Sequence, residues 1–307
     1  MAMTLVEAAK SSQNPLQSGI IELYARSSDI LRALPFNNIS GNALRYNREE
    51  ALPGVGFRGV NEAYTESTGV INPQTEPLVI CGGDLDVDKF ILSTMGNDQR
   101  TQQEAMKVKA LASRFTKAFI KGDAVTEPRE FDGLQVRLTG SQLISAGSTS
   151  GGAALSLAKL DEAIDAVDMP THLIMNRTMR RRLSAAARSS SVGGYITYAL
   201  DEFGRQVTRY NDLPILIVDQ DNSGAEILQF NEAPASGAST ATSIYVVSFA
   251  PGKLTGIQNG GIDVTDLGEL QDKPSLRTRV EWYAGISLWH SKAACRLYSI
   301  GDLAVTA

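Results

Sequence analysis

The chain has 307 residues, of which 43% are hydrophobic and 21% are charged, and its formal net charge at pH 7 is −5. This composition is typical of a soluble globular protein with one large or two ordinary domains. The acidic balance argues against a dedicated nucleic-acid binder with a broad basic face, although it allows a protein that encloses nucleic acid without gripping it.

Targeting signals and reactive side chains are scarce. We find no run of about 18 apolar residues and no basic segment followed by an apolar one, so we expect no membrane span and no secretory signal, hence a protein that is intracellular when made. Cys81 and Cys295 are the two cysteines. They can form one disulfide, but two buried free thiols fit a reducing compartment better. His172 and His290 have no partner at ligand spacing and are interpreted as structural.

The segment Asp84-Leu-Asp86-Val-Asp88 has the start of a calcium loop. Such a loop needs glycine at position 6 and glutamate at position 12, where this chain has Lys89 and Met95. The alternation instead predicts a strand with one acidic, wet face. No nucleophile elbow and no P-loop occurs, so the sequence predicts neither an enzyme nor a metal site nor a cofactor site.

The first part of the chain carries scattered apolar positions. Their spacing predicts a short helix near residues 19–33, ended by Pro35. Residues 1–37 offer too few apolar side chains to fold alone. We interpret them as an arm that packs on another surface.

Residues 41–77 are rich in Gly, Asn, Glu and Arg, and short alternating runs predict a long two-stranded excursion. A loop of this length in a compact domain is either functional or disordered. Within it, Gly54, Gly56 and Gly59 have the spacing of a dinucleotide-binding turn. A nucleotide-dependent enzyme that uses these glycines is therefore one alternative function.

The flanks of these glycines argue against that alternative. A dinucleotide turn needs a buried strand before the first glycine and an amphipathic helix after the last. Here "NREEALP" precedes Gly54 and "VNEAYTESTG" follows Gly59, and both segments are polar. We interpret the glycines as residues that let an extended ribbon twist near its tip.

The strongest local signal is an apolar stripe at helical spacing in "NDQRTQQEAMKVKALASRFTKAFIKGD". It predicts an amphipathic helix of more than twenty residues with Val108, Leu111, Phe115 and Phe119 in the core. Asn97 or Asp98 is expected to cap its start, and Gly122 to end it in a left-handed conformation.

From residue 135 onward the pattern is mixed α/β. It predicts a helix at 157–168, a strand at 171–176, a helix capped by Asn176, and strands at 213–219 and 242–250. The last stretch, "RTRVEWYAGISLWHSKAACRLYSI", predicts two strands that meet near Gly285.

This order of elements resembles the major capsid proteins of tailed bacteriophages, the HK-97-like or Johnson fold. The motifs that carry the resemblance, across residues 20–302, are "FTKAFIKGD" followed by "EFDGL" at 130–134, "LIMNRTMRRRL", "VTRYNDLPILIVD", "KLTGIQNGGIDVTDLGE" and "TRVEWYAGISLWHSKAACRLYSI". The resemblance implies an α+β fold with four parts. These are an N-terminal arm (1–37), an extended loop (38–77), a peripheral domain with the long spine helix (78–135 and 255–282), and an axial domain (136–254 and 283–307).

The resemblance also implies a function. It describes a non-enzymatic shell protein that assembles with itself into hexamers and pentamers of an icosahedral virion capsid, built in the bacterial cytoplasm around double-stranded DNA. The extended loop would lie over a neighbouring subunit through Gly54, Gly56, Phe57, Arg58 and Gly59. Portal, decoration and scaffolding proteins are the implied partners. Encapsulin compartments, which hold cargo enzymes, share the fold and are the alternative.

Two departures from the family limit what the resemblance implies. Some members weld subunits through a lysine in the extended loop, but residues 41–77 contain no lysine. Others carry a long N-terminal scaffolding domain that a protease removes. About 40 residues precede the loop here, so we expect a separate scaffolding protein; the alternative is that this chain is the mature product of such processing.

The helix after Asn176 carries three consecutive arginines, Arg180, Arg181 and Arg182. With the following Leu183 and Ser184 they resemble a basophilic kinase site. We interpret them instead as a basic helix face at a subunit contact or facing packaged DNA, where phosphate contacts would be non-specific.

Overall fold

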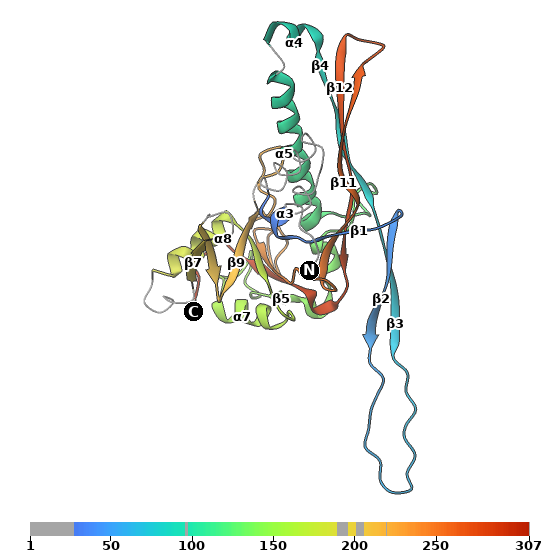
Figure 1. Ribbon diagram of the computed structural model, residues 1–307. Coiled ribbons are helices and arrows are strands. Elements are labelled where there is room, and N and C mark those ends of the chain that lie inside the picture. Colours follow the sequence, from blue (N-terminus) through green and yellow to red (C-terminus); the bar gives the residue numbers. More distant parts are fainter. Residues whose placement is uncertain (1–27, 96–97, 189–195, 201–205, 219, 307) are drawn as a thin grey trace.

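The computed structural model describes residues 28–95, 98–188, 196–200, 206–218 and 220–306. Within them the chain forms a four-stranded sheet, a seven-stranded sheet and a two-stranded ribbon, joined by helices in a mixed α+β fold (Figure 1). The helices are α3 (Asp29–Ala33), α4 (Lys89–Met95), α5 (Asp98–Lys121), α6 (Leu134–Arg137), α7 (Leu157–Asp165) and α8 (Arg177–Ala186), with short 3-10 helices η1 (Gly140–Gln142) and η2 (Ser291–Ala293).

The four-stranded sheet is long and narrow, and α5 runs beside it (Figure 1). Its strand order is β1 (Phe36–Asn38), β11 (Leu254–Glu269), β12 (Ser275–Leu288) and β4 (Val79–Asp88). β1 pairs with β11 in parallel, and the other two pairings are antiparallel. The predicted spine helix and the predicted strand through Asp84 are both confirmed.

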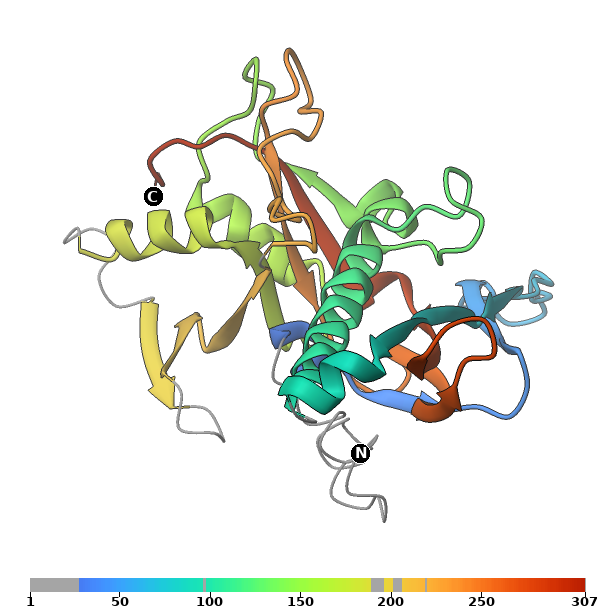
Figure 2. The ribbon, with the colours of Figure 1, turned by 90° about the horizontal axis from the view of Figure 1, so that it is seen from above.

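The seven-stranded sheet forms the wider body of the molecule. Its order is β5 (Leu143–Ser145), β13 (Ala294–Ile300), β10 (Thr242–Val247), β6 (His172–Asn176), β9 (Leu213–Val218), β8 (Gln206–Tyr210) and β7 (Ile196–Leu200). Figure 2 shows α7 and α8 against this sheet, with α5 crossing on the other side. As predicted, Asn176 caps α8: its side-chain oxygen accepts from the backbone N–H of Met179 at 2.7 Å.

Alternation along β10 and β6 divides the buried side chains into two cores. Ile244 and Val246 pack with α7 and α8, whereas Tyr245 and Val247 face the core that contains α5. This is the period-2 pattern of a sheet covered on both faces.

The predicted spine-helix residues lie in the second of these cores. Val108, Phe115 and Phe119 are at most 1% exposed and Leu111 is 7% exposed. The ring of Phe115 lies 4.8 Å from that of Trp282 on β12. Burying side chains of this size stabilises the fold by about 1.5–3 kcal/mol each, so this contact fixes the helix to the long sheet.

Two predictions about glycines are wrong. Gly122 does not adopt a left-handed conformation. A Cβ atom there would lie 2.3 Å from the carbonyl oxygen of Phe131, so the residue allows the following loop to fold back onto the helix end. The last two strands do not meet at Gly285 either. β12 runs through it to Leu288, and a Cβ at Gly285 would lie 3.0 Å from the carbonyl oxygen of Pro77.

Two other predictions are partly confirmed. Both cysteines are free, but only Cys295 is buried, because Cys81 on β4 is half-buried. The helix predicted at residues 19–33 is present as α3 at Asp29–Ala33, and the rest of the predicted range, with most of the N-terminal arm and Asn97, lies outside the described residues.

Candidate assembly surfaces

The ribbon of β2 (Ala43–Ala51) and β3 (Val70–Pro77) extends far from the body of the protein (Figure 1). Its two strands are paired in antiparallel register from Ala43 opposite Pro77 outward. An isolated two-stranded ribbon is marginally stable in water, so its root and its tip need support from other parts of a protein.

The root is held by a buried polar contact. Arg137, the last residue of α6, donates from Nη2 to Oε2 of Glu76 at 2.6 Å and from Nη1 to Oε1. The hydroxyl of Tyr46 donates to the carbonyl oxygen of Leu288 at 2.8 Å and lies 3.3 Å from Glu76 Oε1. The Tyr46 ring packs against the ring of Trp289, with centroids 4.4 Å apart and the ring planes tilted by 34°. We call Tyr46, Glu76, Arg137 and Trp289 the root contact.

Burial keeps Tyr46 of the root contact neutral and makes the pairing of Glu76 with Arg137 necessary. Glu76 and Tyr46 are 7% and 6% exposed. Burial, and next the Glu76 carboxylate, raise the pKa of Tyr46 to about 12. Tyr46 is therefore a neutral donor at physiological pH, while Arg137 supplies the positive charge that Glu76 needs away from water.

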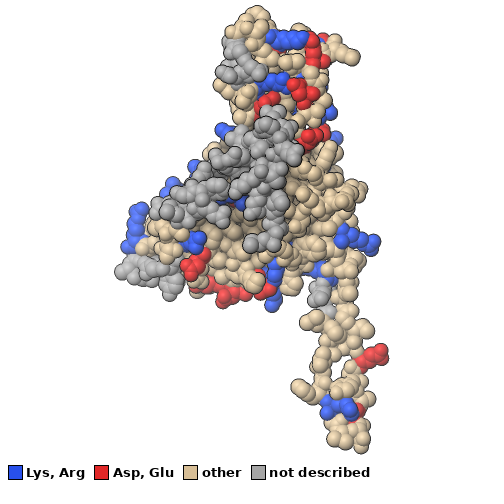
Figure 3. Space-filling model, in the orientation of Figure 1, with Lys and Arg blue, Asp and Glu red and all other residues tan. Residues whose placement is uncertain are grey.

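The far end of the ribbon, residues 52–69, exposes large apolar side chains. Val55, Phe57 and Val60 are 97%, 110% and 92% exposed, and Leu52 is 80% exposed. In the space-filling view this end carries few charges (Figure 3). Apolar side chains clustered at a protruding tip mark a site of contact with another surface.

The tip residues predicted from the sequence lie together there. Gly54 accepts from the hydroxyl of Ser67 across the loop at 2.9 Å, and Gly59 donates to Glu62 Oε2 at 2.8 Å. Arg58 lies over the ring of Tyr64 at 5.2 Å. Gly54 to Gly59 thus sit in an exposed turn of a ribbon, without the buried strand and following helix of a dinucleotide site.

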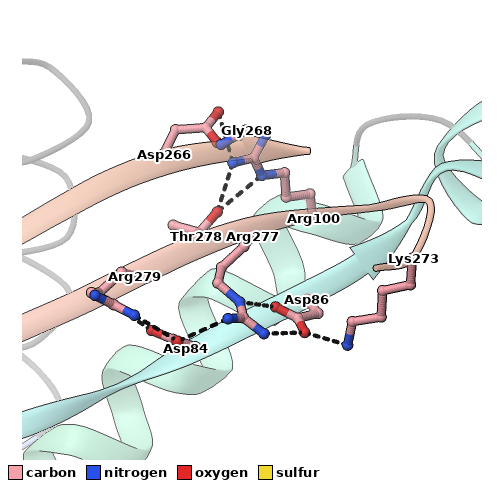
Figure 4. Close-up of polar contacts among 9 residues, drawn as sticks. All are labelled: Asp84, Asp86, Arg100, Asp266, Gly268, Lys273, Arg277, Thr278 and Arg279. Atoms are coloured by element: carbon pink, nitrogen blue, oxygen red, sulfur yellow. Dashed lines mark hydrogen bonds and ion pairs between the residues drawn. The ribbon is translucent and has the colours of Figure 1, made fainter. Parts of the chain in front are cut away.

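The opposite end of the long sheet carries a ladder of ion pairs (Figure 4). Asp86 accepts from Nε and Nη2 of Arg277 at 2.6 and 2.8 Å, and from Lys273 at 2.6 Å. Asp84 accepts from Nε and Nη2 of Arg279 at 2.7 and 3.0 Å. Because these residues alternate along β4 and β12, their side chains share one face of the sheet.

The face beneath the ladder connects the sheet to α5. Arg100 of α5 lies 2.9 Å from Asp266 and donates to the hydroxyl of Thr278 at 2.6 Å. Thr278 in turn donates to Glu104 at 3.0 Å. Arg100 therefore joins three elements, α5, β11 and β12, at the narrow end of the molecule (Figure 4).

Hydrogen bonds from arginine shift the acid–base equilibria of the ladder. Those from Arg279 lower the pKa of Asp84, and those from Arg277 and then Lys273 lower the pKa of Asp86. Exposed pairs contribute little singly, but here several charges form one network. The ladder thus stiffens the hairpin of β11 and β12 against β4.

The three arginines predicted as a basic helix face differ in their exposure and in their partners. Arg181 is exposed, whereas Arg182 pairs with Asp302 at 2.9 Å. The Nε atom of Arg180 is buried and has no hydrogen-bond partner among the described residues. Only Arg181 of the three is fully available on the surface.

The sequence reasoning missed the root contact and the ladder. A usable signal for the ladder was present, because the acidic alternation at 84–88 matches the basic alternation at Arg277 and Arg279. Tyr46, Glu76 and Arg137 carried no comparable signal, since they come from segments that meet only in the folded chain.

Metal ligation and membrane insertion find no support in the described part of the chain. No group of three or more His, Cys, Asp or Glu side chains there could hold a metal ion. None of its helices is both long and apolar enough to cross a membrane.

Comparisons with known proteins agree with this architecture. Residues 12–158 match the family described as major capsid protein GP7. No curated protein matches the sequence. The fold is similar to the SrpI encapsulin of Synechococcus elongatus, with a TM-score of 0.65, 16% identity, and coverage of 100% of this chain and 99% of that chain.

Phage-type capsids are similar to a comparable degree. The capsid of a native GTA particle gives a TM-score of 0.63 at 16% identity, covering 89% of this chain and 90% of the other. The protein of Mycobacterium phage Adephagia gives 0.62 at 13% identity, covering 90% of each. This chain therefore has the HK97-like fold of phage capsid proteins and encapsulins, and its N-terminal region matches the major capsid protein GP7 family.

Proposed function

We propose that this chain is the major capsid protein of a tailed bacteriophage. It assembles into hexamers and pentamers, which form the icosahedral head shell around double-stranded DNA. The observation that carries the proposal is the ribbon: its root is fixed to the body by a buried ion pair, while its apolar tip points away from the body. The exposed tip of such an arm adds little to the stability of its own subunit and is suited to hold a neighbour.

The proposed division of labour follows the fold. Most of the long sheet and α5 belong to the peripheral domain (78–135 and 255–282), and the seven-stranded sheet belongs to the axial domain (136–254 and 283–307). Residues 1–37 act as an arm and 38–77 as the extended loop. No chemical step is assigned to any residue, because a shell protein needs contacts and not catalysis.

The proposed partners are copies of the same chain, a scaffolding protein, a portal and decoration proteins. The DNA is enclosed without sequence recognition, and the exposed Arg181 is the residue of its group that is free to meet phosphates. Assembly takes place in the bacterial cytoplasm, and the mature location is the virion.

The direct test is assembly of the purified protein. We expect sedimentation and negative-stain microscopy to reveal capsomers or closed particles across a range of salt and protein concentrations. A single monomer peak under all conditions would contradict the proposal.

An encapsulin-type compartment is the second candidate. The observation that favours it is the similarity to the SrpI encapsulin, which extends over 100% of this chain. The contents of particles from the native host separate the two functions. DNase-resistant DNA supports the capsid, whereas particles that contain an enzyme and no DNA support the compartment.

A further inference from the structure

Strand β11 contains an irregular stretch with the sequence Asn259-Gly260-Gly261. Both glycines have a positive φ, at 79° and 82°. The pairing of β11 with β12 is interrupted after Gln258 and resumes at Ile262, and the three residues between them have no partner in its register. The parallel pairing with β1 also ends at Gln258. The stretch is therefore a β-bulge that lies outside the register of both neighbouring strands.

The bulge is open to solvent. Asn259 and Gly260 are exposed, and a Cβ atom built on either glycine would meet no atom within 4 Å beyond the adjoining residues. Glycine also has the widest choice of backbone conformations. The main chain can therefore change its conformation here without displacing a packed side chain.

Asn259-Gly260 is the one Asn-Gly step in the sequence. The side chain of an asparagine can react with the backbone nitrogen of the next residue, and glycine hinders this approach least because it has no Cβ atom. The nitrogen of Gly260 bonds to Cγ of Asn259, and the side-chain amide leaves as ammonia with the proton that this nitrogen loses. One water molecule then opens the cyclic imide to aspartate or isoaspartate. The net change exchanges ammonia for water, with no oxidation or reduction.

A second exposed asparagine, Asn222, has the opposite environment. The backbone N–H of Ser223, which would attack it, donates to Oδ1 of Asp221 at 2.8 Å. The carboxylate holds this proton on the nitrogen, because ionising the nitrogen beside a negative charge is unfavourable. The Asn222 side chain itself donates to the carbonyl oxygen of Ala110 at 3.1 Å. Both reacting groups are thus restrained at Asn222.

The side chain of Asn259 holds the turn that leads into the ribbon. Its Nδ2 donates to the carbonyl oxygen of Gly41 at 3.3 Å, and Gly41 lies between the end of β1 and the start of β2. A carboxylate in this position cannot donate, so two acceptors would face each other. Isoaspartate would also lengthen the main chain by one atom between the buried Ile257 and Ile262.

We infer that Asn259 is a deamidation site, and that its conversion to aspartate or isoaspartate releases the turn at Gly41 from the long sheet. The root contact anchors the paired part of the ribbon, whereas Asn259 anchors its entry turn. Conversion therefore weakens the attachment of the ribbon without altering the ribbon's own sequence. The inference concerns the isolated subunit, so it does not depend on the proposed shell function.

The reaction can be followed by peptide mass spectrometry of the purified protein held in mildly alkaline buffer, with a parallel incubation in urea. We expect aspartate and isoaspartate to accumulate at Asn259. Folding should slow the reaction of Asn222 at least about tenfold more than that of Asn259, which is the effect of one charge-assisted hydrogen bond on a rate. If folding slowed the two reactions equally, the assignment of the site would be overturned.

A second test measures the consequence of the reaction. Asn259→Asp reproduces one product directly. We expect faster hydrogen exchange at Ile39, whose backbone N–H lies next to the turn and donates to the carbonyl oxygen of Gln258 at 2.9 Å. Asn222→Asp makes the same chemical change at the other exposed asparagine and should leave exchange at Ile39 unchanged. Equal exchange at Ile39 in Asn259→Asp and wild type would overturn the release of the turn.

Discussion

Arg137 at the end of α6 binds both carboxylate oxygens of Glu76, 61 residues away in the sequence, and so joins the ribbon to the body. The side chains of the pair are 14% and 10% exposed. Removing one member of a buried pair leaves the other charge without compensation, which is more costly than removing both.

We therefore expect Arg137→Ala to free the ribbon. The loss of stability should be up to about 3 kcal/mol, the lower end for a broken buried pair, because a lifted ribbon returns Glu76 to water. Chemical denaturation measures the loss, and light scattering should report failed assembly. The double variant with Glu76→Ala should be less destabilised than Arg137→Ala alone. Equal stability of the two variants would contradict a buried charge contact.

Two phenylalanines separate folding from assembly. Phe119 is 0% exposed and Phe57 is 110% exposed. We expect Phe119→Ala to destabilise the subunit by about 3–5 kcal/mol, as truncation of a buried phenylalanine does. Phe57→Ala should melt like wild type and fail to assemble. Thermal melts measure the stability of the two variants, and sedimentation measures their assembly. Normal assembly of Phe57→Ala would contradict the placement of the ribbon tip at the interface between subunits.

The ion-pair ladder predicts a pH dependence. The pKa of Asp84 is lowered in the folded state, mainly by hydrogen bonds from Arg279. Such a group adds stability above its unfolded pKa of about 3.9, and this contribution is lost as the pH falls through the folded pKa. Wild type should thus melt above Asp84→Asn at neutral pH, and the difference should vanish in acid. If the difference in melting temperature between wild type and Asp84→Asn grew on acidification, the predicted contribution of the Asp84 carboxylate to stability would be contradicted.

Particles should be held together without a covalent weld through the ribbon. Residues 41–77 contain no lysine, so this segment supplies no amine for an isopeptide bond. Boiling in SDS should return a single band near 33.0 kDa. High-mass ladders that survive reducing agent would reveal a cross-link between other residues.

Local patterns in the sequence predicted the elements that local physics determines. The spacing of Val108, Leu111, Phe115 and Phe119 predicted α5, because one face of a helix must be apolar to be buried. The capping role of Asn176 was predicted from its position before the helix, since a helix cap involves a side chain and a backbone N–H only three residues further on. The resemblance to capsid proteins then supplied the fold class.

The errors and omissions have a common cause in contacts between distant segments. Gly285 was interpreted as a strand end, whereas it is small because the chain near Pro77 passes over it. Gly122 was interpreted as a helix terminator, whereas the loop carrying Phe131 requires the space. The root contact likewise depends on α6 meeting the ribbon. Single-sequence patterns carry no information on such crossings.

The direct passage of β3 into β4 has a mechanical consequence. Only Leu78 separates the two strands, and β4 is paired with β12 over ten residues, from Val79 opposite Ala284 to Asp88 opposite Ser275. Interstrand hydrogen bonds lie perpendicular to the strands, so tension along the ribbon loads these bonds in shear and together, not one after another. A pull on the tip is thereby shared over the ten paired residues of β4, and the ribbon can transmit tension without separating strand by strand from its subunit.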